Sequence, residues 1–231
     1  EIVNWLNSDD ALLPGALHHV AKNFTDQNIW MVAGRCMKGP DRKNFRTIPE
    51  SMKPILETDE MLEVPFFQPS TFIRKQVLDE TGMLNRSLHF TMDYEWYVRM
   101  ICRYGNQGIF KTGEVLAFAR LHADSKTALN HLRFFYEKNS VMLHLARCCD
   151  NQAAVELLLQ SGTEHGYQPD WTPVRKPGST FFTRLCDRMK PYAADRSLVW
   201  RESADYFAYY FDEKNARRAA IAAFRVNPFS A

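Results

Sequence analysis

IVNWLNSDD, residues 2–10, joins an apolar run to two adjacent acids. The apolar letters predict a buried strand over residues 2–7, which places Asp9 and Asp10 at its end. Asp is common in turns because its carboxylate accepts nearby backbone hydrogen bonds, so the pair is compatible with a polar turn. Alternatively, carboxylates at a strand end of an open α/β sheet lie where ligands bind, and their oxygens suit magnesium or manganese. The stretch therefore predicts a strand followed by either a polar turn or a cation site.

The segments that follow alternate between helix and strand. Residues 14–24 predict a short helix with Pro14 in its first turn. Residues 30–33 predict a strand that Gly34 ends, and residues 38–54 are polar and basic, which predicts a surface loop.

Two longer motifs come next. Residues 64–82, VPFFQPSTFIRKQVLDETG, predict an extended segment through Gln68, a break at Pro69 and then a helix that Gly82 ends. Residues 92–105, MDYEWYVRMICRYG, predict a second helix.

The rest of the chain loses its strands. Extended segments at 108–111 and 115–121 are followed by a predicted amphipathic helix over 128–149, whose pattern resumes at 153–160. Residues 161–179 are rich in turn formers and predict a linker. From residue 181 the aromatic and alanine spacing is typical of a tetratricopeptide-type helix pair.

The composition is that of an ordinary globular chain of 231 residues, 45% hydrophobic and 24% charged. A formal net charge of +2 is too small to indicate a nucleic-acid partner or an anionic membrane surface. No stretch approaches the roughly 20 apolar residues of a membrane span. The five cysteines lack metal-ligand or redox spacing, so we expect reduced, buried thiols.

Two further groups of polar residues have both a structural and a functional interpretation. Asp93 and Glu95 lie in the first turn of a predicted helix, where acids complement the helix dipole, but Asp93 also suits a general base. The segment FARLHADSKT, residues 118–127, ends a predicted strand with Arg, His, Ser, Lys and Thr. A lone His is more often structural, but this density of donors indicates phosphate binding.

Four segments together resemble the second half of a family-two inverting glycosyltransferase. They are, in chain order, WLNSDD with LLPGAL, QPSTFIRKQVLDETGMLN, FTMDYEWYVRM and ARLHADSKT. The resemblance covers about residues 1–135. It implies a partial, Rossmann-like A-type glycosyltransferase domain of α/β class over 1–135, lacking its N-terminal nucleotide-binding strands. An α-helical C-terminal region over 136–231 would follow, tetratricopeptide-like from about residue 180.

The resemblance implies a divalent metal, Mn²⁺ or Mg²⁺, at the first strand end. The family's Asp-x-Asp motif binds the metal and the sugar nucleotide, and Asn7-Ser8-Asp9 occupies its place with an amide instead of the first acid. Metal ligation is therefore expected from Asp9, from Asp10 or from both, with His122 as a further ligand. The expected donor- and phosphate-binding residues are Asn7, Ser8, Arg120, Ser125 and Lys126.

The resemblance also places the catalytic base at Asp93. The family carries a Glu-Asp motif at a helix start, which Met92-Asp93 matches with Met in place of Glu. Asp93 is expected to deprotonate the acceptor hydroxyl as it attacks the anomeric carbon from the face opposite the diphosphate. Trp96 is either a core residue or a platform for a sugar ring. The expected acceptor-side residues are Gln68, Ser70, Glu95, Trp96 and Arg99.

The resemblance implies an inverting enzyme that moves a sugar from a nucleotide diphosphate sugar to a saccharide or lipid-linked acceptor, in bacterial surface-polysaccharide synthesis. The expected location is the cytoplasm or, as a peripheral protein, the inner membrane face. The alternative is a degenerate, non-catalytic module in which Asn7 and Met92 record lost catalysis and the C-terminal helices bind a protein partner.

The resemblance finally predicts that the sequence is partial. Family members begin with a nucleotide-binding segment that has no counterpart here. We therefore expect the chain to start inside the catalytic domain, to be inactive by itself, and to be cut after Asn227-Pro228 as well.

Overall fold

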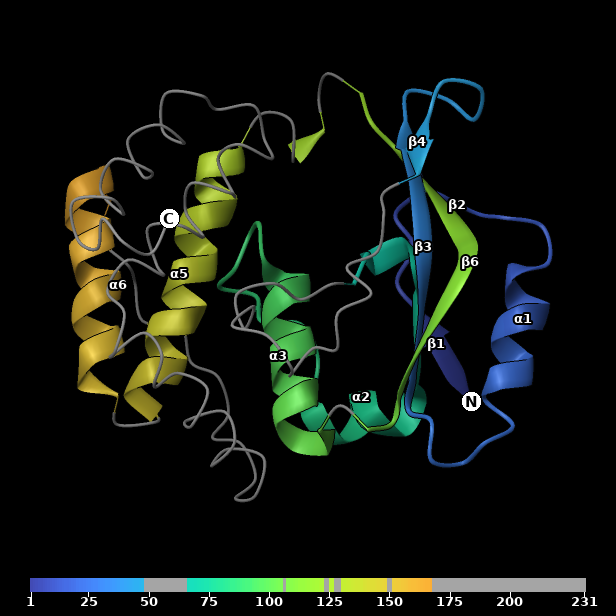
Figure 1. Ribbon diagram of the computed structural model, residues 1–231, viewed down its shortest axis with the longest axis horizontal. Helices are drawn as coiled ribbons and strands as arrows, with labels where there is room; N and C mark the ends of the chain where they lie inside the picture. The colour runs from blue at the N-terminus through green and yellow to red at the C-terminus, as the bar shows by residue number, and fades with distance from the viewer. Residues whose placement is uncertain (48–65, 106, 123–124, 127–129, 149–150, 168–231) are drawn as a thin grey trace, which may run out of the picture. The chain divides into compact units, whose positions relative to one another are not determined.

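The computed structural model describes residues 1–47, 66–105, 107–122, 125–126, 130–148 and 151–167 (Figure 1). These residues divide into two compact units. The first contains the described residues up to Asn85 and those from Trp96 to residue 126. The second contains residues 86–95 and those from Asn130 onward.

The first unit is built on a mixed β-sheet (Figure 1). Within the described ranges the sheet has six strands in the order β1-β5-β3-β6-β2, with β4 paired to β3. The β3–β6 pair is parallel and the other pairs are antiparallel. The strands are β1 Ile2–Asn4, β2 Ala11–Leu12, β3 Met31–Gly39, β4 Arg46–Thr47, β5 Thr71–Arg74 and β6 Ile109–Arg120.

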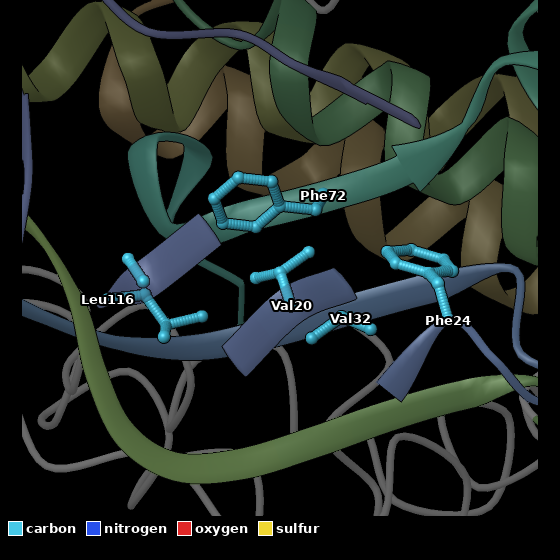
Figure 2. Close-up of a cluster of buried hydrophobic side chains, with 6 residues drawn as sticks. Val20, Phe24, Val32, Phe72 and Leu116 are labelled. Carbon is cyan, nitrogen blue, oxygen red and sulfur yellow. The ribbon is translucent and has the colours of Figure 1, made fainter. Parts of the chain in front are cut away.

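Helix α1, Ala16–Asn23, confirms the helix expected near Pro14 and packs on one face of this sheet. Its buried side chains repeat every four positions, the spacing that puts them on one side of a helix. They meet apolar side chains from β3, β5 and β6 (Figure 2). The cluster consists of Ala16, Val20, Phe24, Val32, Phe72 and Leu116, each at most 5% exposed.

The sequence predicted that strand β3 ends at Gly34, but this prediction is wrong. The strand continues to Gly39, and its register with β6 shifts on both sides of Arg35. A Cβ built at Gly34 would lie 2.4 Å from the Leu116 side chain and 2.9 Å from the Glu114 carbonyl oxygen. The glycine therefore allows β6 to approach closely at an irregularity instead of ending the strand.

The predicted helix before Gly82 is too long at its start. A 3₁₀ helix, η1 Gln68–Ser70, comes first, then β5, and only then α2, Lys75–Thr81. Thr71, Phe72 and Ile73 are buried, and β5 lies between β1 and β3. These residue types suit a central strand, so tertiary pairing prevails over the helical pattern. Gly82, with φ 83°, ends α2 as expected.

The other predicted elements are present with altered limits. The first strand is confirmed but covers only Ile2–Asn4. Helix α3, Met92–Tyr104, matches its prediction and is followed by Gly105 with φ 74°. The two extended segments near residues 108–121 form the single strand β6.

The second unit contains two long helices, α5 His131–Cys148 and α6 Gln152–His165 (Figure 1). The Asn151 side chain caps α6 by accepting a hydrogen bond from the Ala154 N–H at 3.0 Å. Residues 161–165, predicted as linker, are the last turns of α6. The predicted tetratricopeptide-like helices lie outside the described residues. No described helix has the length and apolar character that crossing a membrane requires.

Candidate active site

The two acids occupy the connection between β1 and β2. The backbone turns there because the Asp10 N–H donates to the Asn7 carbonyl at 3.2 Å. Asp9 and Ser8 are exposed at this turn, and Asp10 is half-buried. The turn interpretation and the ligand interpretation of these acids therefore describe the same short loop.

Three sequence motifs meet at this loop. The Asn7 side-chain amide donates to Asp10 Oδ2 at 3.0 Å and to Gln68 Oε1 at 3.1 Å. The Gln68 amide in turn donates to the Trp5 carbonyl. The other oxygen of Asp10, Oδ1, accepts the Arg120 backbone N–H at 3.1 Å. Both Asp10 oxygens are thus engaged inside the protein.

His122 completes the group. Its Nε2 lies 3.2 Å from Asp9 Oδ2, and both side chains remain more than a third exposed. The His122 N–H donates to Ser125 Oγ, and the Ser125 N–H returns a bond to the His122 carbonyl, both at 2.9 Å. Ser125 is thus joined to His122 by two hydrogen bonds. We call Asn7, Asp9, Asp10, Gln68, Arg120 and His122 the strand-tip cluster.

The electrostatics of the cluster centre on Asp10. Burial raises the pKa of its carboxyl above the ordinary value, and the charge of Asp9 adds to the rise. The Arg120 N–H, the Asn7 amide and the Lys38 charge act in the opposite direction. Burial likewise raises the pKa of the nearby Cys36 thiol to about 11, so this free, buried cysteine stays protonated at neutral pH, as expected of a structural thiol.

Other predicted residues around the cluster have structural partners. Ser70 is fully buried, and its hydroxyl donates to the Gly34 carbonyl at 2.8 Å. Asn4 holds the adjoining backbone by donating to the Pro69 and Thr71 carbonyls. The placement of Gln68 near the acids therefore depends on a rigid η1–β5 junction. Lys126 is exposed.

A divalent cation can be tested against this donor set. Among the described residues, no three or more His, Cys, Asp or Glu side chains are grouped so as to hold a metal ion. In the cluster, Asp9 Oδ2 and His122 Nε2 are adjacent oxygen and nitrogen donors on partly exposed side chains. A carboxylate oxygen is the donor type that Mg²⁺ and Mn²⁺ favour, and Mg²⁺ commonly takes one or two carboxylates and completes its shell with phosphate oxygens and water.

Asp93 and Glu95 belong to the second unit, whereas the residues of the strand-tip cluster belong to the first. Both lie in the first turn of α3, where Asp93 Oδ1 accepts the Tyr94 N–H at 2.8 Å. Glu95 is only 1% exposed.

Trp96 and Arg99, further along α3, are buried within the first unit. The Trp96 Nε1 donates to the Gly82 carbonyl at 3.2 Å. The Arg99 guanidinium donates to the Thr81 and Met83 carbonyls and so binds the end of α2. These contacts are the ones a core residue makes, and acceptor roles for both residues stay predictions.

Sequence reasoning missed Glu137. Its carboxylate, on α5, accepts backbone hydrogen bonds from the segment that leads into α3. Glu137 stands in an amphipathic helix without a motif, so only its tertiary partners reveal it.

Comparison with known proteins gives a limited likeness. No protein-family model and no curated protein matches the sequence. Among solved structures, the chain is similar to TarS 1–349 of S. aureus in complex with UDP-GlcNAc, at 14% identity and a TM-score of 0.49, covering 97% of this chain and 66% of that one. The complex of TarS 1–349 with UDP is similar at 15% identity and a TM-score of 0.44, covering 97% of this chain and 64% of that one. This chain thus spans less than two thirds of the length of either.

Proposed function

We propose that this chain is the metal- and acceptor-binding half of an inverting glycosyltransferase of A-type fold whose donor is a nucleotide diphosphate sugar. The observation that carries the proposal is the strand-tip cluster. Asn7 reaches Gln68 across 61 positions, and Asp9 reaches His122 across 113. A simple surface turn does not need polar partners from two distant motifs. Asn7 and Asp9 follow the carboxyl end of β1 and His122 follows that of β6, and the carboxyl ends of strands are where open α/β sheets bind their ligands.

The proposed reaction is an inverting displacement at the anomeric carbon of the donor sugar. The acceptor hydroxyl oxygen bonds to the anomeric carbon while the bond from that carbon to the diphosphate oxygen breaks, and the diphosphate leaves with the electron pair. Attack from the opposite face inverts the configuration. Asp93 takes the hydroxyl proton as general base. Asp9 and His122 would hold a Mn²⁺ or Mg²⁺, which would supply positive charge against the leaving diphosphate.

The test replaces Asp93 by Asn in the full-length protein, assayed with UDP-, GDP- and dTDP-sugars and saccharide or lipid-linked acceptors. Asn keeps the size but removes the base, so we expect kcat to fall by about 100-fold or more. Donor affinity should change less than about twofold, because the substitution removes a transition-state interaction. The matched control is Asp79→Asn on α2, an exposed carboxylate paired with Lys75. Normal turnover in Asp93→Asn contradicts the proposal.

A second candidate, a non-catalytic sugar-nucleotide-binding module, is favoured by one observation. Asn7 donates to Asp10 and Gln68 instead of offering an acid, so both oxygens of Asp10 are engaged. Mn²⁺ added with each sugar nucleotide distinguishes the two. Metal-dependent donor hydrolysis supports the enzyme, and a thermal shift without turnover supports the module.

A further inference from the structure

Within the second unit, helix α5 contacts residues on either side of Asp93 in the sequence. The Phe90 and Phe134 rings meet edge to face, with centroids 5.3 Å apart. The Tyr94 hydroxyl lies 3.0 Å from Met142 Sδ, and the Lys138 ammonium lies 5.5 Å from the Tyr94 ring centroid. The α5 residues in these contacts are spaced by about one helical turn, so they form one face of the helix.

Glu137 lies on that face and makes the most specific of the contacts. Its Oε1 accepts the His89 N–H at 2.9 Å, and its Oε2 accepts the N–H groups of Phe90 at 2.7 Å and Thr91 at 2.9 Å. The Thr91 hydroxyl lies 3.3 Å from the same oxygen. Three consecutive backbone N–H groups directed at one anion form a nest. Hydrogen bonds to a carboxylate are stronger than hydrogen bonds between neutral groups.

This arrangement fixes the backbone just before α3 begins at Met92. A bidentate carboxylate bound to three successive N–H groups allows little rotation about the dihedral angles between them. Asp93 follows two residues after the last of these donors. The direction in which the chain enters α3 therefore depends on α5. The position of the Asp93 backbone, from which its side chain projects, depends on α5 as well.

We infer that Glu137 is a positioning residue that acts through Asp93, an inference that rests on the proposed function. Helix α5 would then hold the general base in position. Most of this helix belongs to the predicted α-helical C-terminal region, outside the predicted catalytic domain. Glu137 touches backbone amides and is not assigned contact with substrate. Its loss should weaken the chemical step more than donor binding, since a misplaced general base affects the transition state.

The experiment uses Glu137→Gln and Glu137→Asp in the full-length protein, with Glu156→Gln as control. Glu156 is an exposed carboxylate on α6 that accepts a hydrogen bond from the Gln152 side-chain amide, one turn away, at 3.2 Å. Gln keeps the volume but offers a single acceptor oxygen, whereas Asp is shorter but keeps two. A packing role predicts that Gln is harmless and Asp harmful. A nest-binding role predicts the reverse order.

For Glu137→Gln we expect faster hydrogen exchange at the amides of residues 89–91 and a fall in kcat of about 10- to 100-fold. Donor affinity should stay within about twofold, and Glu137→Asp should recover part of kcat. Unchanged kcat, or a loss of donor binding equal to the loss of kcat, overturns the inference. If Glu137→Gln does not fold, Glu137→Asp carries the same measurements.

A double-mutant cycle separates this inference from the proposed function. If Glu137 acts through Asp93, Asp93→Asn with Glu137→Gln should be no slower than Asp93→Asn alone. Losses that multiply overturn the positioning role. Full activity in Asp93→Asn overturns the proposed function itself. A strong Asp93→Asn defect with normal Glu137→Gln kcat overturns only the role of Glu137.

Discussion

Asn7 does what a carboxylate at the same position cannot do. Its amide donates one hydrogen bond to Asp10 and one to Gln68, whereas an ionised Asp accepts hydrogen bonds and donates none. An Asp at position 7 would also bring a second negative charge to Asp10. Asn at position 7 therefore stabilises the loop, whereas an Asp there would add a charge that could bind a cation.

Replacing Asn7 by Asp should show both effects. Without added metal, we expect the free energy of unfolding to fall by about 0.5–1 kcal/mol, because two hydrogen bonds at an exposed site are lost. Added Mn²⁺ should restore part of it by screening the clustered acids. Urea unfolding with and without Mn²⁺ measures both. Ser8→Asp, which adds the same charge to the same turn, is the control, and an equal loss in Ser8→Asp would contradict the donor role of Asn7.

The raised pKa of Asp10 predicts a pH dependence of stability. Burial raises the pKa of this carboxyl in the folded state, while the unfolded chain keeps the ordinary value. Between the two values the folded state binds more protons, so the contribution of Asp10 to stability is present at low pH and is lost as pH rises through the folded pKa. Asp10→Asn cannot titrate, so its stability relative to the native chain should increase from about pH 3 to pH 7.

The measurement is the free energy of unfolding of both proteins across that range. A difference that is flat, or that declines as pH rises, contradicts the pKa direction. Asp41→Asn provides contrast, because backbone N–H groups of Asn44 and Lys43 and the Asn44 side chain lower the pKa of Asp41, so its contribution is lost as pH falls.

The close approach of β3 and β6 depends on Gly34, which has no side chain. Gly34→Ala would drive a methyl group into Leu116 and the Glu114 carbonyl, so we expect a loss of about 1–3 kcal/mol in the free energy of unfolding. Gly113→Ala on β6 is the control, since a Cβ there meets nothing within 4 Å. Thermal unfolding compares them, and equal stability of the two variants would contradict the close approach.

Elements with strong local signals could be predicted from sequence. The helix α3 has a regular apolar pattern and a terminal glycine, and it appears where predicted. The segment containing Phe72 has weaker local preference, and its pairing with β1 and β3 decides its conformation. Pairing between strands about 40 to 70 residues apart cannot be read from one short window.

The same distinction applies to the candidate site. Asp9 and His122 were expected near one cation, and their side chains do meet at 3.2 Å, although metal binding stays a prediction. Arg99 binds the end of α2, and Glu137 binds the backbone before α3. Both contacts depend on helix packing, which no sequence motif encodes.

At the scale of the whole molecule, the strand-tip cluster and Asp93 draw on different parts of the fold. The cluster depends on the sheet, whereas the Asp93 segment depends on α5. The low net charge of +2 gives no long-range field that would direct the chain to polyanions. The donor recognition proposed above would therefore depend on local groups such as those of the cluster.

The position of β6 has a consequence for synthesis. Strands β1, β2 and β3 are translated first, but β6, Ile109–Arg120, is the strand that pairs with both β2 and β3. Until residue 120 leaves the ribosome, β2 lacks this neighbour and one side of β3 stays open. Long-range pairing of this kind folds slowly and leaves strand edges exposed in the meantime. Those edges of the nascent chain are where chaperones would bind and where aggregation would start.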